Sequence, residues 1–402
     1  MTQTLQTRPA IPVTVWMLGF VSLLMDVSSE MVNTLLPLYL TTGLGASALA
    51  VGMIEGAAVA VATLTKFLSG LLADLSQRAK LLAVLGYGLA AVSRLLFPLS
   101  VSVDQVVLAK SVDRVGKGIR GAPRDAMIAA AAPAEIRGAS FGLRKSLDTV
   151  GGFAGPLLAI GAMMLFAGSF TQVFWLAAIP AALAMVVLIF FVRAPESAEP
   201  RKKKRFKLRD ALLLTRPVWA VIGFAAVVMV ARFSEAFVLL KALEAGFSAT
   251  WVPLVIVILH AAYGLTAYPV GRLSDRMGSR GLLTISLAFL AAAHAVIAVA
   301  SGTAMFVLGA VLWGLHMGFS QGLLASLIAA QTPEHLRGSA FGTFNLVTGL
   351  VLLIGNALAG WIWFSFGSAA PFWLGAALSV ALVITLVFKR KSARKAHVSR
   401  PR

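Results

Sequence analysis

Twelve stretches of mostly apolar residues run through the chain, and each has about the 20 residues that a helix needs to cross a bilayer. Prolines inside these stretches, such as Pro37 and Pro156, are compatible with spanning helices because membrane helices tolerate them. The pattern predicts an all-α membrane protein with twelve transmembrane helices. The predicted spans are approximately 13–40, 48–72, 81–101, 105–128, 139–165, 171–193, 217–240, 251–271, 282–301, 304–330, 339–363 and 370–388.

The composition excludes several classes of protein. Hydrophobic residues make up 59% of the chain, charged residues 13%, and the mean hydropathy is +0.87, whereas soluble domains are about 45–50% apolar and about 25% charged. A soluble enzyme, a disordered protein and a nucleic-acid-binding module are therefore disfavoured. The chain has no cysteine, so disulfides, thiolate metal sites and a cysteine nucleophile are absent.

The net charge of +19 is concentrated beside apolar stretches. Arg201–Arg209 contains seven Lys/Arg residues, and the tail from Lys389 contains seven more. Basic loops mark the cytoplasmic side of a membrane protein, so we expect an inner-membrane protein with both termini in the cytoplasm. The basic runs are interpreted as topology determinants, with lipid-binding switches as the alternative.

An internal repeat divides the chain into halves. Gly70 and Asp74 recur as Gly271 and Asp275, 201 residues later, and a Pro…Arg-Gly pattern at 133–138 recurs at 333–338. Such repeats are typical of secondary transporters, which place the substrate site where the halves meet. The sequence predicts an N-terminal six-helix bundle (1–193), a cytoplasmic linker (194–216), a C-terminal six-helix bundle (217–388) and a basic tail (389–402).

Several motifs resemble those of the major facilitator superfamily. The segment GLLADLSQRAK at 70–80 is similar to the superfamily's loop 2–3 signature, and GRLSDRMGSR at 271–280 is a second copy. Arg114-x-x-x-Gly118 resembles its helix-4 arginine motif. The glycines of 142–156, followed by Pro156, partly match the helix-5 motif of its antiporters.

The resemblance implies a major facilitator fold of two pseudo-symmetric bundles that works by alternating access. Asp74, at the end of the second helix, can pair with a helix N-terminus or an arginine and so latch one conformation, with topology and turn chemistry as the alternative. The glycines and proline of the fifth helix allow close packing that gates the pathway, with packing alone as the alternative. The predicted gating residues are Gly70, Asp74, Arg78, Gly271, Asp275, Arg276, Gly151, Gly155 and Pro156.

Charged residues inside the spans are the second strong signal. A charge at the bilayer centre costs about 2.5–3.5 kcal/mol on insertion scales, so these side chains must pair or line an aqueous cavity. Asp26 and Glu30 are four residues apart and share one helix face. We predict that Asp26 or Glu30 carries a proton, with Arg114 as the paired cation. The alternative is a permanent charge network that locks the helices together.

Bases outnumber acids nine to six in the spans of the first half. An excess of positive charge in a cavity favours an anionic or zwitterionic substrate. The histidines and methionines show no clustered metal-ligand spacing, so no metal site is predicted. The predicted cavity residues are Asn33, Lys117, Arg144, Lys145, Asp148, Arg232, Glu235, Gln321 and Asn345.

These observations predict a secondary transporter, most simply a proton-coupled exporter of a small organic molecule. Three alternatives remain: a transporter of an anionic metabolite or siderophore, a metal-ion exporter, and a membrane receptor or scaffold without transport. The expected partners are a small-molecule substrate, protons and the lipid bilayer. We expect a monomer without a cofactor, without nucleic acid and without enzymatic activity, because no nucleophile–base arrangement or nucleotide-binding loop is present.

Overall fold

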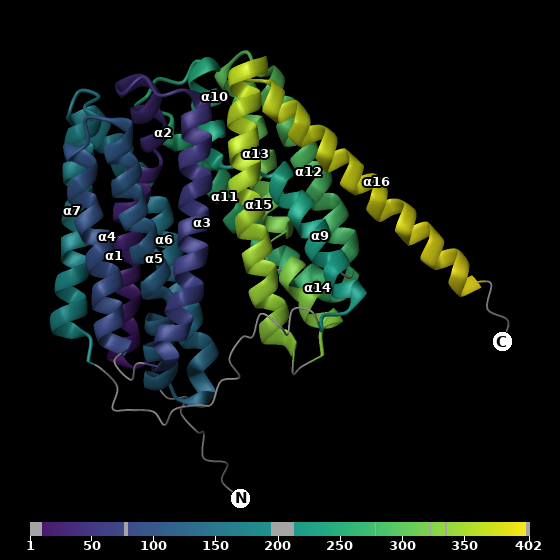
Figure 1. Ribbon diagram of the computed structural model, residues 1–402, viewed down its shortest axis with the longest axis horizontal. Helices are drawn as coiled ribbons and strands as arrows, with labels where there is room; N and C mark the ends of the chain where they lie inside the picture. The colour runs from purple at the N-terminus through teal and green to yellow at the C-terminus, as the bar shows by residue number, and fades with distance from the viewer. Residues whose placement is uncertain are drawn as a thin grey trace, which may run out of the picture. The chain divides into compact units, whose positions relative to one another are not determined.

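The computed structural model describes residues 10–75, 79–193, 213–277, 279–320, 323–333 and 336–398. Side chains at 67–75, 134, 268, 271–277, 279–280, 325–326, 338 and 389–398 are not described. Nearly all of the described chain is helical, and it contains no strand (Figure 1). The prediction of an all-α protein is confirmed.

The first half of the chain forms the helices that its apolar stretches predict. Ser102 begins one of them by accepting a hydrogen bond from the backbone N–H of Gln105, which satisfies a donor that the first turn leaves free. The elements are α1 (Val13–Asn33), α2 (Leu36–Leu38), a π-helical turn (Tyr39–Gly43), α3 (Ala48–Leu75), α4 (Ala79–Leu99), α5 (Val103–Ala131), a 3₁₀ turn (Ala134–Ile136), α6 (Arg137–Leu165), α7 (Phe170–Val186) and a π-helical turn (Val187–Phe191).

The second half repeats this order of long helices with short connections. Its elements are α9 (Arg216–Ala231), α10 (Glu235–Glu244), α11 (Pro253–Met277), α12 (Ser279–Val299), α13 (Thr303–Ser320), α14 (Leu323–Gln331), α15 (Arg337–Phe366) and α16 (Ala370–Val398).

Ten spans within the described residues are long and apolar enough to cross a membrane. The two remaining predicted spans are also helical. One is α5, which carries five basic residues, and the other is α11, whose apolar part covers Pro253–Ala267. Large apolar side chains such as Leu95, Leu108, Trp175 and Phe190 are exposed, as expected of surfaces that lipid covers. The helices are therefore consistent with the twelve predicted spans.

The contacts within the chain define two compact units. Unit 1 comprises Met1–Leu36 and Val61–Arg205, and unit 2 comprises Pro37–Ala60 and Phe206–Arg402. The first part of α3 thus groups with the second half of the chain. It packs tightly on α15: a Cβ added at Gly56 would lie 2.7 Å from the carbonyl oxygen of Leu353.

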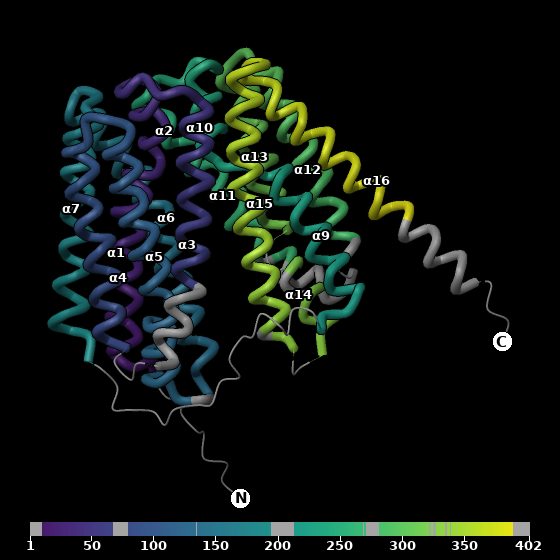
Figure 2. Tube along the Cα trace, in the orientation of Figure 1, coloured from purple at the N-terminus to yellow at the C-terminus, as the bar shows by residue number. Residues whose placement is uncertain are grey.

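In unit 1, α1 packs against α6 and α7, and α4 packs against α5 and α7 (Figure 2). The pair α4 and α5 approaches closely because both helices present glycine. A Cβ at Gly116 would lie 2.6 Å from the carbonyl oxygen of Gly86. Small residues permit such approach in membranes, where packing rather than hydrophobic burial drives association. The short distance between α4 and α5 allows their polar side chains to meet.

The internal repeat is visible in the packing of each unit. In unit 1, Gly118 of α5 faces Thr65 of α3, and a Cβ on the glycine would lie 2.6 Å from the threonine Cβ. In unit 2, Gly318 of α13 makes the same contact with Thr266 of α11. Glycine and threonine are displaced by 200 and 201 residues between the two pairs. The repeated sequence therefore folds with the same helix-to-helix contact in both units.

The seventh span is interrupted between α9 and α10. Residues 232–234 are not helical, and side chains from other helices bond the free backbone groups. Asn356 of α15 accepts a hydrogen bond from the Ser234 N–H at 2.8 Å, and the His294 Nε2 atom of α12 lies 2.9 Å from the Ala231 carbonyl oxygen. Broken helices are tolerated at membrane depth only when such partners satisfy the backbone.

Candidate functional site

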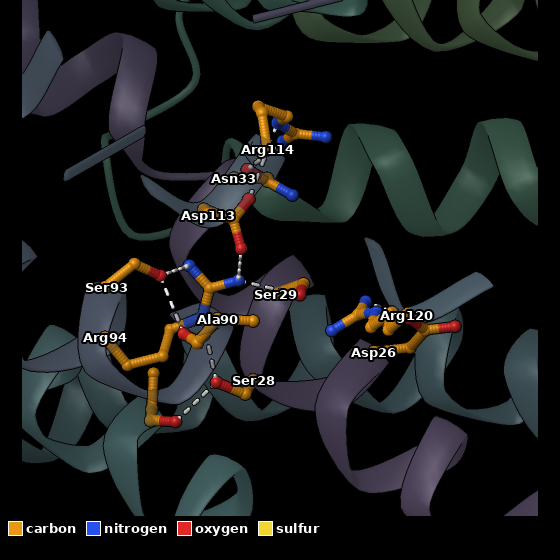
Figure 3. A network of polar contacts seen from close by, with 11 residues as sticks. Asp26, Ser28, Ser29, Asn33, Ala90, Ser93, Arg94, Asp113, Arg114 and Arg120 are labelled. Atoms are coloured by element: carbon orange, nitrogen blue, oxygen red, sulfur yellow. Dashed lines mark hydrogen bonds and ion pairs between the residues drawn. The ribbon is translucent and has the colours of Figure 1, made fainter. Parts of the chain in front are cut away.

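The candidate site lies in unit 1, where charged side chains of α1, α4 and α5 meet (Figure 3). Asp113 of α5 is its centre. The Arg94 guanidinium of α4 donates to Asp113 Oδ1 at 2.7 Å, and the exposed fractions of the two side chains are 0% and 5%. This is a fully buried ion pair, of the kind that is retained only when its hydrogen bonds are satisfied.

Two serines of α1 complete the surroundings of Arg94. Its Nε atom donates to the Ser28 hydroxyl at 3.1 Å, and its Nη2 atom donates to the Ser29 hydroxyl at 2.8 Å. Ser28 in turn donates to the carbonyl oxygen of Ala177 at 2.6 Å. Arg94 therefore links α1, α4 and α5 in one network, and α7 is joined to it through Ser28.

Arg114, which the sequence predicts as the paired cation, joins the same carboxylate. Its Nε atom lies 3.4 Å from Asp113 Oδ2, and its Nη2 atom donates to Asn33 Oδ1 at 3.2 Å. Asp113 thus has one arginine on each oxygen. The structure brings two of the predicted site residues, Arg114 and Asn33, together beside a third residue that the prediction did not include.

Asp26 lies in a neighbouring pair with Arg120 of α5. The Arg120 Nη2 atom is 3.9 Å from Asp26 Oδ1, and the exposed fractions of the two side chains are 6% and 30%. The Arg120 guanidinium also lies over the Tyr87 ring, 4.7 Å from its centroid, which is close enough for a cation–π interaction. Asp26 is therefore held by a longer ion pair than Asp113 and is more exposed.

Glu30 follows Asp26 by one turn of α1 and is half-buried. The glycines of α6 pack on this part of α1. A Cβ at Gly151 would lie 3.0 Å from the Asp26 Cβ, and one at Gly155 would lie 2.6 Å from the Glu30 Cβ. Gly151, Gly155 and the adjacent Pro156 are buried. These predicted gating residues thus set the distance between α6 and the helix that carries both carboxylates.

Other predicted cavity residues of unit 1 lie on α5 and α6. Arg144 forms an ion pair with Asp148 at 3.0 Å on α6, and the adjacent Lys145 is exposed. Lys117 of α5 is also exposed. Within the described part of the chain, Lys117 has neither a hydrogen bond nor an ion pair within 4 Å.

The predicted residues of unit 2 lie at the helix break or apart from it. Arg232, the first residue of the break, and Glu235, the first residue of α10, form a long ion pair of 3.8 Å. Asn345 is exposed on α15, and Gln321 lies outside the described residues. Asn356, which holds the break, was a polar residue of the second half that the predicted cavity residues did not include. Its signal in the sequence was only that of an amide inside an apolar span.

The residues of the predicted latches at the helix ends have side chains that the structure does not describe. Gly70 and Asp74 are on α3, and Gly271, Asp275 and Arg276 are on α11, in stretches whose side chains are not described. Arg78 lies outside the described residues. Their gating role stays a prediction.

No group of three or more His, Asp or Glu side chains suited to a metal ion occurs among the described residues. The two histidines that are buried in the described part of the chain have structural contacts. His294 bonds the end of α9, and the His316 Nδ1 atom lies 2.9 Å from the Ser286 hydroxyl and 3.0 Å from the Ser286 carbonyl oxygen. Both therefore have a structural partner through one ring nitrogen.

Arg94 and Arg120, like Asp113, belong to this charge network and were not selected by the sequence analysis. Both are arginines inside predicted spans, which signals that each needs a carboxylate partner. Each partner lies on another helix, Asp113 for Arg94 and Asp26 for Arg120. The sequence does not give the register between helices, so these partners could not be assigned from it.

Comparison with known proteins assigns the whole chain to a family. The family model for the Major Facilitator Superfamily matches residues 18–261 and 242–402. The uncharacterized MFS-type transporter MJ1317 of Methanocaldococcus jannaschii is 29% identical over 380 residues, which cover 93% of this chain and 94% of that protein.

A shorter match links the chain to the class B tetracycline resistance protein of Escherichia coli, which is 29% identical over 135 residues, 33% of each chain. Among solved structures, the nucleoside transporter NupG is similar with a TM-score of 0.76 at 15% identity, over 93% of this chain and 98% of that chain. At this identity the likeness concerns the fold alone.

Proposed function

The chain belongs to the major facilitator superfamily, and from that premise we propose that it is a proton-coupled exporter of a small organic molecule. Membership establishes a multi-pass membrane transporter with the two-bundle fold. The proposal adds the coupling ion, the direction and the residues. It also adds that the protein is a monomer in the inner membrane. Both termini are proposed to lie in the cytoplasm, as the basic loops favour.

The contrast between Asp26 and Asp113 carries the proposal. A proton carrier must exchange its proton with water and must not be held permanently by a cation. Asp113 is buried, and arginines contact both of its oxygens at 2.7 and 3.4 Å, so it is suited to a fixed structural charge. Asp26 is 30% exposed and has a 3.9 Å ion pair. Of the two, Asp26 fits the carrier.

Glu30 supports the same role from the next turn of α1. It shares the helix face of Asp26, and α6 packs on both positions through Gly151 and Gly155. A movement of α6 against α1 therefore alters the surroundings of both carboxylates. The partial match of segment 142–156 to an antiporter motif supports proton exchange. The similarity to a tetracycline resistance protein supports export of a small organic molecule.

Proteoliposomes with an internal pH-sensitive dye test the proposal. A pH gradient is imposed, and compounds from a panel that includes tetracycline are added one at a time. With the wild-type protein, a transported compound is expected to drive a proton flux across the vesicle membrane, which the dye reports. Asp26→Asn and Glu30→Gln are expected to remove this proton flux, while counterflow of the same compound continues. Unchanged proton flux in both variants would rule out the carrier.

Asp125→Asn is the matched control. Asp125 is on α5, its side chain is 45% exposed, and it pairs with the adjacent Arg124 at 3.0 Å. The substitution removes one carboxylate of unit 1 without touching Asp26 or its partner Arg120. Proton flux through this variant is expected to equal that of the wild type.

A further inference from the structure

The basic side chains of α5 outnumber its acidic ones, and one of them has no counter-ion within 4 Å among the described residues. The helix carries five basic residues, Lys110, Arg114, Lys117, Arg120 and Arg124, against Asp104, Asp113 and Asp125. Arg114 contacts Asp113, Arg120 contacts Asp26, and Arg124 contacts Asp125. Lys117 is exposed, and in the part of the chain that the structure describes no acid lies within 4 Å of it.

The position of Lys117 excludes an ordinary surface role. It lies near the middle of α5, between Arg114 and Arg120. A lysine at this depth does not face lipid without a large cost. Its exposed surface therefore faces a space that water or a ligand fills.

Two neighbouring guanidinium groups have N–H donors to spare. Arg120 Nη1 is buried and makes no hydrogen bond with any described residue, and Arg114 Nε makes only its 3.4 Å ion pair with Asp113. Because residues three apart on a helix lie close together, Arg114, Lys117 and Arg120 form one broad cationic face. Free donors on an arginine fork and a lysine ammonium are the groups that bind carboxylates and phosphates.

We infer that Lys117, assisted by Arg114 and Arg120, binds a carboxylate or phosphate group of the transported molecule. This inference rests on the proposed function and names the class of substrate, an organic molecule with an anionic group. Asp26 lies beside the same face through Arg120. A basic group on the same molecule would compete there with the proton, as exchange requires, so the site is suited to an amphoteric molecule.

The test uses the absence of native cysteine. Gly121 lies one turn after Lys117 on α5, and a side chain added there meets nothing within 4 Å. In full-length Gly121→Cys, we expect the anionic reagent sulfonatoethyl methanethiosulfonate to react faster than its cationic trimethylammonioethyl analogue. Gly302→Cys, in the connection between α12 and α13, supplies the reference ratio for a thiol away from this face.

Adding Lys117→Gln to the Gly121→Cys protein is expected to lower the anionic-to-cationic rate ratio at the introduced thiol by about fivefold, since loss of one positive charge affects the two reagents in opposite directions. Lys117→Arg is expected to preserve the ratio. Citrate is expected to slow the anionic reagent more than chloride at equal ionic strength. Monodisperse elution of each variant in detergent confirms that the variants remain folded.

Three results would overturn the inference: no labelling of Gly121→Cys by either reagent, a ratio that Lys117→Gln leaves unchanged, or equal slowing by citrate and chloride. The labelling needs no proton gradient, so it is independent of the Asp26 experiment. Charge-selective labelling with unchanged proton flux in both Asp26→Asn and Glu30→Gln would refute the proposed coupling and keep the anion site. Labelling without charge selectivity, together with loss of proton flux in the Asp26 and Glu30 variants, would refute only the anion site.

Discussion

The Nη2 atom of Arg94 lies 2.7 Å from Oδ1 of Asp113, and both side chains are buried between α4 and α5. Arg114 holds the second oxygen of the same carboxylate. With both oxygens engaged, Asp113 keeps two arginines inside unit 1. The pair therefore fixes helices, while the coupling chemistry that we propose belongs to Asp26.

Asp113→Asn is expected to destabilise the protein strongly. Removing one partner of a buried ion pair leaves the other charge uncompensated, which typically costs about 3–5 kcal/mol. Thermal unfolding of the purified protein in detergent measures the loss. Asp125→Asn, which affects a pair whose carboxylate side chain is 45% exposed, is expected to change stability by about 1 kcal/mol or less. Equal melting temperatures for the two variants would refute a structural role for Asp113.

Gly155→Ala is expected to lower stability by about 1–3 kcal/mol, because the added Cβ overpacks the contact with α1 at Glu30. Gly152→Ala on the same helix is the control, since its Cβ meets nothing within 4 Å. It is expected to be neutral or slightly stabilising, as alanine favours helix. The melting temperatures of the Gly155→Ala and Gly152→Ala proteins test this expectation. A Gly155→Ala protein as stable as Gly152→Ala contradicts the close packing of α6 on α1.

Asn356→Leu is expected to weaken the junction of α9 and α10. The substitution removes the acceptor of the Ser234 N–H, and an unsatisfied donor costs about 1–3 kcal/mol. Hydrogen–deuterium exchange is expected to rise at residues 232–236 and to stay unchanged in α12. Asn345→Leu, at an exposed position on the same helix, is expected to leave exchange at the junction as it is. Equal protection in both variants would show that Asn356 does not hold the break.

Two substitutions of Tyr87 distinguish the contribution of its ring to stability from that of its hydroxyl group. Tyr87→Phe loses only the hydrogen bonds of the hydroxyl group, with Ser22 at 3.2 Å and with Arg124, and a hydrogen bond is worth about 0.5–1.5 kcal/mol. Tyr87→Leu also loses the contact with the Arg120 guanidinium, which is worth about 2 kcal/mol when desolvated. We expect a lower melting temperature for the leucine variant than for the phenylalanine variant. The reverse order would exclude a stabilising cation–π contact.

The helices were predictable because length and hydropathy determine a membrane span. The interruption at residues 232–234 was not, because Arg232, Phe233 and Ser234 include neither proline nor glycine. The helix ends there because Asn356 and His294, more than 60 residues away, bond the backbone on either side. Such long-range replacement of helical hydrogen bonds leaves no local pattern.

The candidate site was also predictable only in part. The face shared by Asp26 and Glu30 follows from a spacing of four residues, and the prediction of charge pairing follows from the cost of charges in hydrocarbon. The partners depend on how α4 and α5 are rotated against α1. The structure gives Asp26 an ion pair with Arg120 and gives Arg114 one with Asp113. Neither pairing is visible in a single sequence.

The matching contacts of Gly118 with Thr65 and of Gly318 with Thr266 bear on the history of the gene. A duplication of an ancestral six-helix segment accounts for both contacts at once. The mechanical scaffold was then retained in each descendant copy, whereas ionisable residues at matching sites diverged: Arg114 and Arg120 correspond to Gly314 and Ser320. The first copy thus carries the charged residues at these positions, while the second copy has the same helix packing without them.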